Sequence, residues 1–490
     1  MSEFDFSLQG NKAKVFIIYK SEIVNRFDPT HLFSIRKHRS NYKYETKKLS
    51  SITTSFTGGT PSKNNSSYWN GAIPWASAKD FKCLSISNTE DTISELGFKM
   101  SSAKIVPANS LVMVVRSGIL KHTLPTAVNL KEITINQDIK AFIPQICISS
   151  KYLNYFFFVF NEKILSIVVK HSKTVQSINS EELNDLQIPI PPSAIQEQII
   201  SIMDNALELF EHKKNEAIQL LSQIDCELTK ELGLKIESNN DYRNIDRQLD
   251  RTYCKVQSGQ IFLVQYKDVV ESRLDPIFYN ANIQKFTNCT YSERLSNLAL
   301  SFTNGFAVGR QDQVEAENGI LQIRPTNIDN NGRLKYDKNV YVPEMSDIPF
   351  IESGVVLFNN TNSQEWVGKT TYFANKENMK VYTSNHITAI DVDRSKILPE
   401  YLCAILNMYQ RHKVFYSICT NWNNQSGIGL DLLKSLHIPL FTNDRKDSLR
   451  RQQEIVDRIN SIYQEADECI SSANRIMETA KAKVESMIIG

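Results

Sequence analysis

The sequence is short of features that would place the protein in a membrane or an oxidising compartment. Its eight cysteines are scattered, with no Cys-x-x-Cys or Cys-x-x-His spacing, so neither a zinc site nor a disulfide framework is predicted. The N-terminus lacks the basic and apolar regions of a signal peptide. The most apolar run, Tyr152–Phe160, is too short to cross a bilayer. We therefore expect a soluble, cytoplasmic protein.

The chain also has no large excess of positive or of negative residues. The net charge is only +2 over 490 residues, so any binding of nucleic acid must come from local patches. The hydrophobic share of 41% and the charged share of 22% are ordinary for globular proteins. At this length the chain exceeds one hydrophobic core and divides into about three domains.

Signatures of catalysis are absent as well. Gly368, Lys369 and Thr370 resemble the end of a phosphate-binding loop, but Ser363 stands where that loop needs another glycine. The residues that follow favour a strand, whereas a phosphate-binding loop leads into a helix. No DNA methyltransferase motif, nuclease motif or metal-ligand spacing of histidines is present, so we expect no catalytic residue, metal or cofactor in this chain.

The sequence contains an internal repeat, which is the first organisation to look for in a chain of this length. Val15–Phe33 returns as Ile261–Tyr279, and Lys47–Gly59 returns as Glu293–Gly305. Later blocks follow in the same order, so the two halves are predicted to fold alike. Their globular parts, at 15–188 and 261–438, are rich in short β-branched and aromatic runs, which predicts strands. One helix is expected at Ser150–Val169 and its twin at Pro399–Ser417.

Each half ends in a long segment with apolar residues spaced by three and four, one from about Ser193 to Leu234 and one from about Arg450 to Ile488. This spacing predicts two coiled-coil helices, and we favour their antiparallel pairing over each helix folding back on its own domain. The predicted fold class is α+β, with two similar mixed α/β domains separated by two long antiparallel helices. The predicted parts are 1–190 (first domain), 191–235 (first helix), 236–260 (linker), 261–440 (second domain) and 441–490 (second helix).

Four features of the sequence are typical of one protein family: the segments Gly58–Phe81, Val355–Phe373 and Ile188–Asp204, and the paired Arg-Phe-Asp-Pro and Arg-Leu-Asp-Pro segments. Through them the chain resembles the DNA-specificity subunits of type I restriction–modification systems. The resemblance implies two target-recognition domains that each read one half of a bipartite, asymmetric DNA sequence. It also implies two methyltransferase subunits docked on the helices and motor-nuclease subunits in the full complex. S-adenosylmethionine, ATP and Mg would be bound by those partners.

Residues for reading DNA are expected on loops between strands, where amide, hydroxyl and basic side chains can reach base edges. The candidates are Lys63, Asn64, Trp69, Ser77, Lys79, Arg116, Asn136, Gln137, Arg310, Arg324, Asn327, Asn359, Asn360, Asn362, Lys369, Asn385 and His386. Partner contacts on the helices are predicted at Ile199, Ile202, Leu209, Ile455, Ile459 and Ile462.

Plainer roles compete with several of these assignments. Trp69 can brace its loop, and Lys63 and Lys79 can be solvated surface charges. The asparagines of 359–362 can satisfy their own turn through side-chain-to-backbone bonds. In the repeat, Arg116 is aligned opposite Asn360, Lys369 is predicted to contact phosphate, and the loop 421–429 is a further candidate for facing DNA.

Two other functions stay open. One is a non-catalytic, two-lobed adaptor that binds proteins instead of DNA. The other is a DNA-modifying enzyme with an unrecognised active site. Neither the target bases nor the gap between half-sites follows from the residues.

Overall fold

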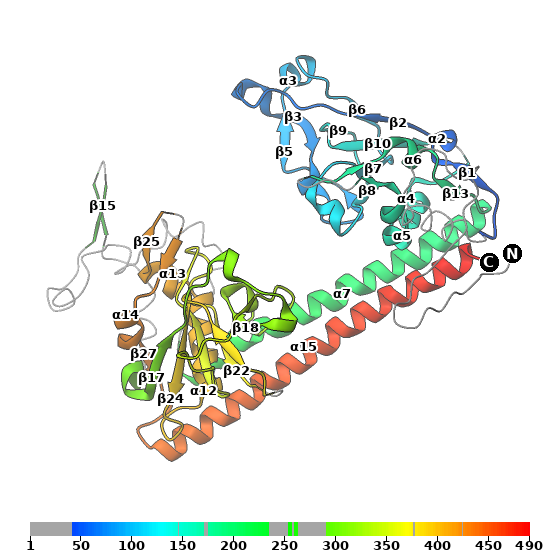
Figure 1. Cartoon of the computed structure of the whole chain (residues 1–490). Coiled ribbons are helices and arrows are strands. Elements are labelled where there is room, and N and C mark those ends of the chain that lie inside the picture. Colours follow the sequence, from blue (N-terminus) through cyan, green and yellow to red (C-terminus); the bar gives the residue numbers. More distant parts are fainter. Residues whose placement is uncertain are drawn as a thin grey trace. The chain divides into compact units, whose positions relative to one another are not determined.

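The computed structural model describes residues 42–145, 147–170, 175–234, 253–256, 259–262, 291–375, 378–423 and 425–490. The chain divides into two compact units, one formed by Met1–Lys214 with Ser471–Gly490 and the other by Asn215–Ile470. Each contains one mixed α/β domain and segments of two long helices (Figure 1). The repeated block 15–33 lies outside the described residues. Its partner at 261–279 and the predicted linker lie largely outside them, apart from strands β14 (Tyr253–Val256) and β15 (Gly259–Phe262).

The domain of the first unit is built on two sheets. The five-stranded sheet has the order β2 (Thr53–Thr57), β10 (Ile139–Pro144), β7 (Leu111–Val114), β8 (Thr126–Asn129), β4 (Ser85–Ile86). The four-stranded sheet has the order β5 (Asp91–Ile93), β3 (Trp69–Ala76), β9 (Ile133–Ile135), β6 (Ile105–Val106). Strand β7 is buried along its whole length, as its unbroken apolar sequence requires. Helices α4 (Ser150–Val159) and α5 (Asn161–Val168) share its core.

The second unit repeats this plan. Its main sheet has the order β17 (Ala299–Asn304), β24 (Ile387–Val392), β20 (Val355–Asn359), β22 (Thr370–Phe373). Two smaller sheets have the orders β19 (Tyr341–Val342), β18 (Ile320–Ile323), β23 (Val381–Thr383) and β21 (Thr361–Asn362), β26 (Gln425–Gly427), β25 (Thr420–Trp422). Helices α12 (Pro399–Arg411) and α13 (Val414–Ile418) complete the domain. The predicted helix at 399–417 is therefore two helices, since Lys413 adopts a left-handed conformation between them.

Gly368 belongs to a strand connection and not to a phosphate-binding loop. Its φ is +89°, and a Cβ there would lie 2.1 Å from the Phe415 ring, so only glycine fits. The strand β22 follows directly, as the sequence predicted.

The same strand pairing and the same tyrosine hydrogen bond recur in both domains, which confirms the internal repeat. Strand β1 (Thr46–Lys48) pairs with β13 (Gln187–Pro189), and β16 (Ser292–Arg294) pairs with β27 (His437–Pro439). The Tyr152 hydroxyl donates to the Pro189 carbonyl at 2.9 Å, and Tyr401 donates to Pro439 at 2.8 Å. These bonds connect helix α4 to β13 and helix α12 to β27, the strands that precede the long helices.

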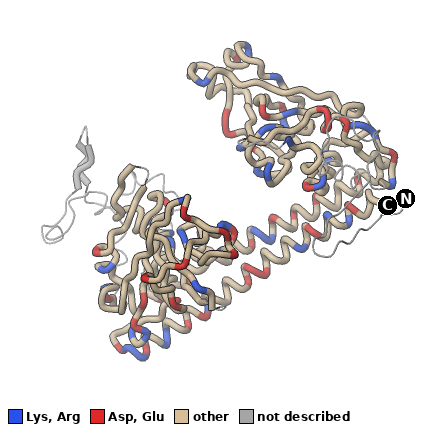
Figure 2. Tube along the Cα trace, in the orientation of Figure 1, with Lys and Arg blue, Asp and Glu red and all other residues tan. Residues whose placement is uncertain are grey.

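The two long helices, α7 (Ser193–Glu231) and α15 (Arg445–Ile488), are continuous. Helix α15 begins before the predicted Arg450, because the Asp444 carboxylate accepts a bond from the Asp447 N–H at 2.8 Å and caps the helix. Basic and acidic residues both occur along the two helices (Figure 2). Among the described residues, no helix has the length and apolarity that a membrane span requires.

Segments of α7 and α15 pack against each other within each unit. In the first unit, Ile199 and Met203 near the start of α7 share a core with Val484 near the end of α15. In the second, Leu228 near the end of α7 shares a core with Ile455 near the start of α15. Opposite ends meet in both cases, so the predicted antiparallel pairing is confirmed.

This packing corrects part of the predicted partner surface. The side chains of Ile199, Ile455 and Ile459 are buried inside the chain's own core and are not available to another subunit. Ile202 and Ile462 are partly buried against the same cores. Only Leu209, at 52% exposure, keeps the accessibility that was expected of the whole set. The pairing seam continues from Ile199 through Met203 and Ala206, so Met203 takes the buried place that was predicted for Ile202.

A buried glutamine joins each domain to the long helix that follows it. Gln196 on α7 accepts from the Ser149 N–H at 3.0 Å and donates to the carbonyls of Cys147 and Pro191. At the corresponding place on α15, Gln452 accepts from the Leu398 N–H at 2.9 Å. Each buried amide accepts from the backbone N–H of a half-buried residue just before a domain helix.

Replacing Gln196 with leucine is expected to destabilise the first unit. The change puts a side chain of similar size at this site but removes the partner of the buried Pro191 carbonyl and of the partly buried Ser149 N–H. A buried group left without a partner costs about 1–3 kcal/mol. Urea unfolding followed by circular dichroism should show a lower midpoint for Gln196→Leu. The control is Gln198→Leu on the exposed face of the same helix, and equal midpoints for the two variants would contradict the role given to Gln196.

Candidate nucleic-acid interface

Four loops of the second unit meet at one end of its main sheet, where β17 and β20 finish and β24 begins. The Phe306 N–H donates to the Thr383 carbonyl at 3.1 Å, and the Asn360 N–H donates to the His386 carbonyl at 3.0 Å. The Ile428 N–H then donates to the Asn360 carbonyl at 2.9 Å. We call residues 303–305, 360–364, 384–386, 420–423 and 425–427 the second rim.

The second rim carries hydrogen-bonding groups and no charge. Its sequence contains asparagine, glutamine, threonine, serine and one histidine, but no aspartate, glutamate, lysine or arginine. Its exposed members include Thr303, Asn304, Ser363, Asn385, Asn421 and Gln425. Amide and hydroxyl groups both donate and accept, which suits them to the mixed edges of base pairs.

Trp422 gives the second rim an aromatic surface. Its side chain is 49% exposed, and its six-membered ring lies so close to Gly427 that a Cβ on that glycine would sit 2.6 Å from Trp422 Cη2. The strand backbone thus supports the indole while about half of the side chain stays open. Aromatic side chains held in this way stack on nucleobases in many nucleic-acid-binding proteins.

Equivalent loops meet at the same end of the first unit's sheet. The Gly59 N–H donates to the Ile135 carbonyl at 3.0 Å. The Val115 N–H donates to the backbone carbonyl of Asp138 at 2.8 Å, and the Ile178 N–H donates to the Val115 carbonyl at 2.8 Å. We call residues 57–60, 115–117, 136–138 and 175–178 the first rim. It carries the exposed Arg116 and the half-buried Asp138, so its chemistry differs from that of the second rim.

The backbone pairing corrects the predicted alignment of the two rims. Val114 pairs with Ile139, as Asn359 pairs with Ile387. Arg116 then bridges to Ser177, as Thr361 pairs with Gly427. Arg116 therefore occupies the place of Thr361 and not that of Asn360, because the alignment by eye was shifted by one residue.

The first unit exposes some predicted residues and buries others. Lys63, Asn64, Arg116 and Gln137 are exposed, as is Lys79, which pairs with Asp91 at 3.7 Å. Three others serve the fold. Trp69 donates to the Ser62 carbonyl at 3.1 Å and stacks edge-on with Trp75, which is the bracing alternative. Ser77 caps a 3-10 helix, and Asn136 accepts from the Asp138 N–H at 3.0 Å. The buried Ser77 and Asn136 are thus not accessible base readers.

In the second unit most predicted amides point inward. Asn327 is fully buried, accepts from the Arg324 N–H and donates to the Lys335 carbonyl. Asn359 is also fully buried, and Asn360 donates to Thr388 Oγ1 at 2.9 Å. These three side chains hold strands and turns together, which corrects the prediction that they read bases.

The remaining predicted residues of the second unit stay nearer the surface. Arg310 and Asn385 are exposed, and His386 is half-buried. Asn362 accepts from the Ser363 N–H at 2.8 Å, as the local-turn alternative proposed. Arg324 donates from Nη2 to Gln322 Oε1 at 2.8 Å, and burial lowers its pKa.

Lys369 is not the exposed phosphate contact that its sequence context suggested. Its Nζ donates to the Ile328 carbonyl at 2.7 Å and lies 5.6 Å from the Trp366 ring centre. Burial lowers the pKa of this ammonium group. The side chain therefore anchors one loop to another.

Sequence reasoning missed Trp422 and Gln425 as individual candidates, although it had noted the loop that contains them. The available signal was a run of polar residues without charge around one tryptophan. Within the described part of the chain, no cluster of histidine, cysteine and acidic residues is arranged to hold a metal ion.

Comparison with known proteins identifies the first domain. Residues 41–220 match the family described as the type I restriction modification DNA specificity domain. The chain carries such a specificity domain. The matched region spans the described part of the first globular domain, with the first rim, and the first part of α7. The second domain is related to it through the internal repeat.

Curated relatives agree with this assignment. The chain is 37% identical over 205 residues to the EcoR124I/EcoR124II specificity subunit of Escherichia coli, covering 38% of this chain and 51% of that protein. It is 27% identical over 251 residues to the MjaIX specificity subunit of Methanocaldococcus jannaschii, covering 49% and 56%. The matches thus span about half the length of these relatives.

Two solved structures were also matched. An S subunit from M. genitalium has 11% identity and a TM-score of 0.39, over 92% of this chain and 97% of that one. A chain from a structural study of type I complex assembly has 11% identity and a TM-score of 0.49, over 90% and 97%.

The internal role of Lys369 leads to a testable expectation. Lys369→Met should lower the thermal unfolding temperature, because the Ile328 carbonyl loses its buried donor. It should not change how DNA affinity depends on salt. The control is Lys63→Met, which removes an exposed lysine and should leave stability unchanged. If Lys369→Met lowered the slope of log affinity against log salt by about one, the lysine would contact phosphate after all.

Proposed function

We propose that this chain is the DNA-recognition subunit of a type I restriction–modification complex, in which each domain reads one half of a bipartite target. The observation that carries the proposal is the pair of rims, built at the same place in two related domains, the first of which is a specificity domain. Two readers on one chain raise each other's effective concentration on DNA, which helps to offset the small net charge.

The differences between the rims favour an asymmetric target. Arg116 of the first rim can make a bidentate contact with guanine, whereas Thr361 holds the equivalent place in the second. Asp138 of the first rim corresponds to His386, since each carbonyl accepts the equivalent backbone N–H. Two domains with the same fold and different rim chemistry suit two different half-sites.

The proposed partners follow from the same assignment. Two methyltransferase subunits would dock on the long helices, and motor-nuclease subunits would join in the full complex. The exposed Leu209 and Ile218 on α7 support docking there. In this proposal the chain is non-catalytic, and S-adenosylmethionine, ATP and Mg are bound by the partners. The adaptor alternative is less well supported because it gives the matching rims and the specificity domain no role.

The proposal is tested by selecting duplexes from a random library with the full-length chain, alone and with its methyltransferase subunit. We expect the selected duplexes to share a bipartite sequence with a fixed gap. The logarithm of the affinity for them should fall linearly with the logarithm of the salt concentration. An adaptor would enrich no sequence, and that result would overturn the proposal.

Trp422 should contribute to affinity for the selected duplex. Loss of a base-stacking aromatic costs about 1–3 kcal/mol, so Trp422→Ala should weaken binding by about tenfold or more, as measured by fluorescence anisotropy. The control is Tyr336→Ala, which removes an aromatic side chain that is 44% exposed outside the rims. Equal affinities of the two variants for the duplex would show that Trp422 does not contribute to DNA binding.

A further inference from the structure

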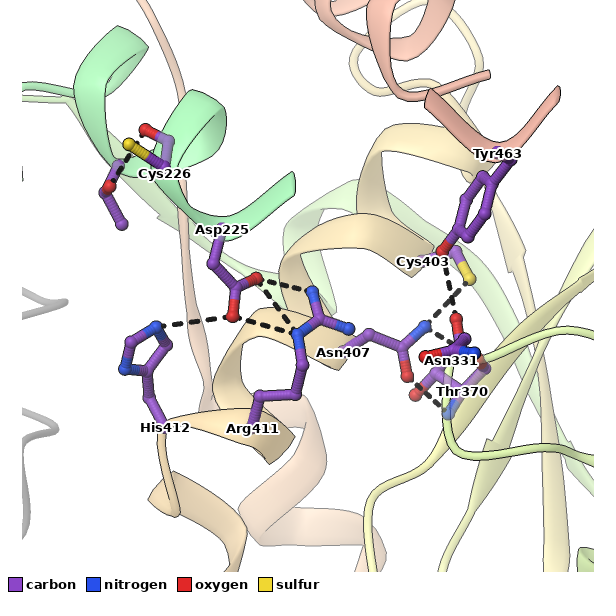
Figure 3. Close-up of polar contacts among 10 residues, drawn as sticks. Asp225, Cys226, Asn331, Thr370, Cys403, Asn407, Arg411, His412 and Tyr463 are labelled. Carbon is purple, nitrogen blue, oxygen red and sulfur yellow. Dashed lines mark hydrogen bonds and ion pairs between the residues drawn. The ribbon is translucent and has the colours of Figure 1, made fainter. Parts of the chain in front are cut away.

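In the second unit, the last residue of domain helix α12 is bound to long helix α7. Arg411 Nε lies 3.0 and 2.9 Å from the two carboxylate oxygens of Asp225, and Arg411 Nη2 approaches the same group (Figure 3). His412 Nε2 lies 3.5 Å from Asp225 Oδ2. The arginine and aspartate side chains are only 29% and 22% exposed. This is an ion pair with a fixed fork geometry, largely shielded from water.

Helix α12 also holds the segment that borders the second rim. One turn before Arg411, the Asn407 side chain accepts from the Thr370 N–H at 3.0 Å and donates to the Thr370 carbonyl at 2.7 Å. Gln410 donates to the Glu365 carbonyl at 2.9 Å. Strand β22, which begins at Thr370, pairs with β20, and β20 leads directly into the rim. Figure 3 shows Asp225, Arg411, Asn407 and Thr370 in succession.

The environment keeps this ion pair charged. Burial alone would raise the pKa of the Asp225 carboxyl, but hydrogen bonds and charges from His412 and Arg411 outweigh it and lower the pKa. Because the pair is shielded, removal of either partner leaves an uncompensated charge. Few other orientations of α12 on α7 would retain the two-pronged contact.

The first unit has a weaker contact at the corresponding place. Lys163 on domain helix α5 pairs with Glu485 on α15. Each domain therefore reaches the long helix that does not directly follow it. Here, however, the side chains are 49% and 41% exposed, and a flexible lysine replaces the planar guanidinium. Exposed pairs of this kind constrain orientation little.

We propose that Asp225 and Arg411 are positioning residues that fix the orientation of the second rim on α7, and so restrict the gap between half-sites that the protein accepts. This inference rests on the proposed function of reading a bipartite target. Neither residue touches DNA. Their effect passes through Asn407 and the strand pairing to the rim.

The experiment measures binding of the full-length chain to duplexes that carry both selected half-sites with the gap varied one base pair at a time. For Asp225→Asn we expect the preference for the best gap over its neighbours to fall by about tenfold. Affinity for a duplex with only the second half-site should stay unchanged. Arg411→Lys keeps the charge but not the fork, so it should show an intermediate loss and provides a second, milder variant.

Matched controls separate positioning from general damage. Lys163→Met and Glu485→Gln break the exposed pair of the first unit and should keep the wild-type gap preference. A uniform loss of affinity at every gap in both Asp225→Asn and Arg411→Lys would show a purely structural pair and overturn the inference, as would unchanged gap preference. If the wild-type chain selected no bipartite sequence at all, the proposed function itself would fail, which is a different result.

Discussion

The pairing of α7 with α15 is the constraint on which each unit depends. A domain sheet alone leaves one face of its helices uncovered, and side chains from both long helices fill it. In the first unit, Tyr152, Ile199 and Val484 come from three helices and belong to one core. In the second, Tyr401, Leu228 and Ile455 do the same. Neither domain core is closed by the following long helix alone, because side chains of the other long helix belong to it as well. Folding of each domain is therefore coupled to the helix pair.

This coupling explains where polar residues are tolerated in the interior. Gln196 and Gln452 lie at the start of their helices, where they meet backbone groups at the beginning of a domain helix. A glutamine is long enough to reach across that junction and has both a donor and an acceptor. The fully satisfied amide also requires one particular docking of the domain, which an apolar side chain would not.

The two rims have the same backbone arrangement but different side chains. Backbone bonds such as Val115 to Asp138 and Asn360 to His386 hold the loops and do not depend on side-chain identity. Side chains at equivalent places can then differ, as the exposed Arg116 and the half-buried Thr361 do. The low net charge of the chain fits this division, because base-edge hydrogen bonds provide selectivity while phosphate contacts provide general attraction.

Sequence alone determined the organisation of the chain. The repeat, the two long helices and the strand after Gly368 follow from local patterns, because apolar spacing and backbone propensities act over a few residues. Resemblance of whole segments pointed to the specificity domain for the same reason. Three of the four loops of the second rim were also found, because uncharged amide-rich runs between strands are visible in the sequence.

Tertiary structure alone decided which polar side chains in those loops face outward. Asn327, Asn360 and Lys369 are residue types that suit a binding loop, but the side chain of each bonds to another segment of the fold. The one-residue shift that sets Arg116 against Thr361 depends on sheet register, and the Asp225–Arg411 pair joins residues 186 positions apart. Such contacts are fixed by packing at long range, where a local pattern carries no information about direction or burial.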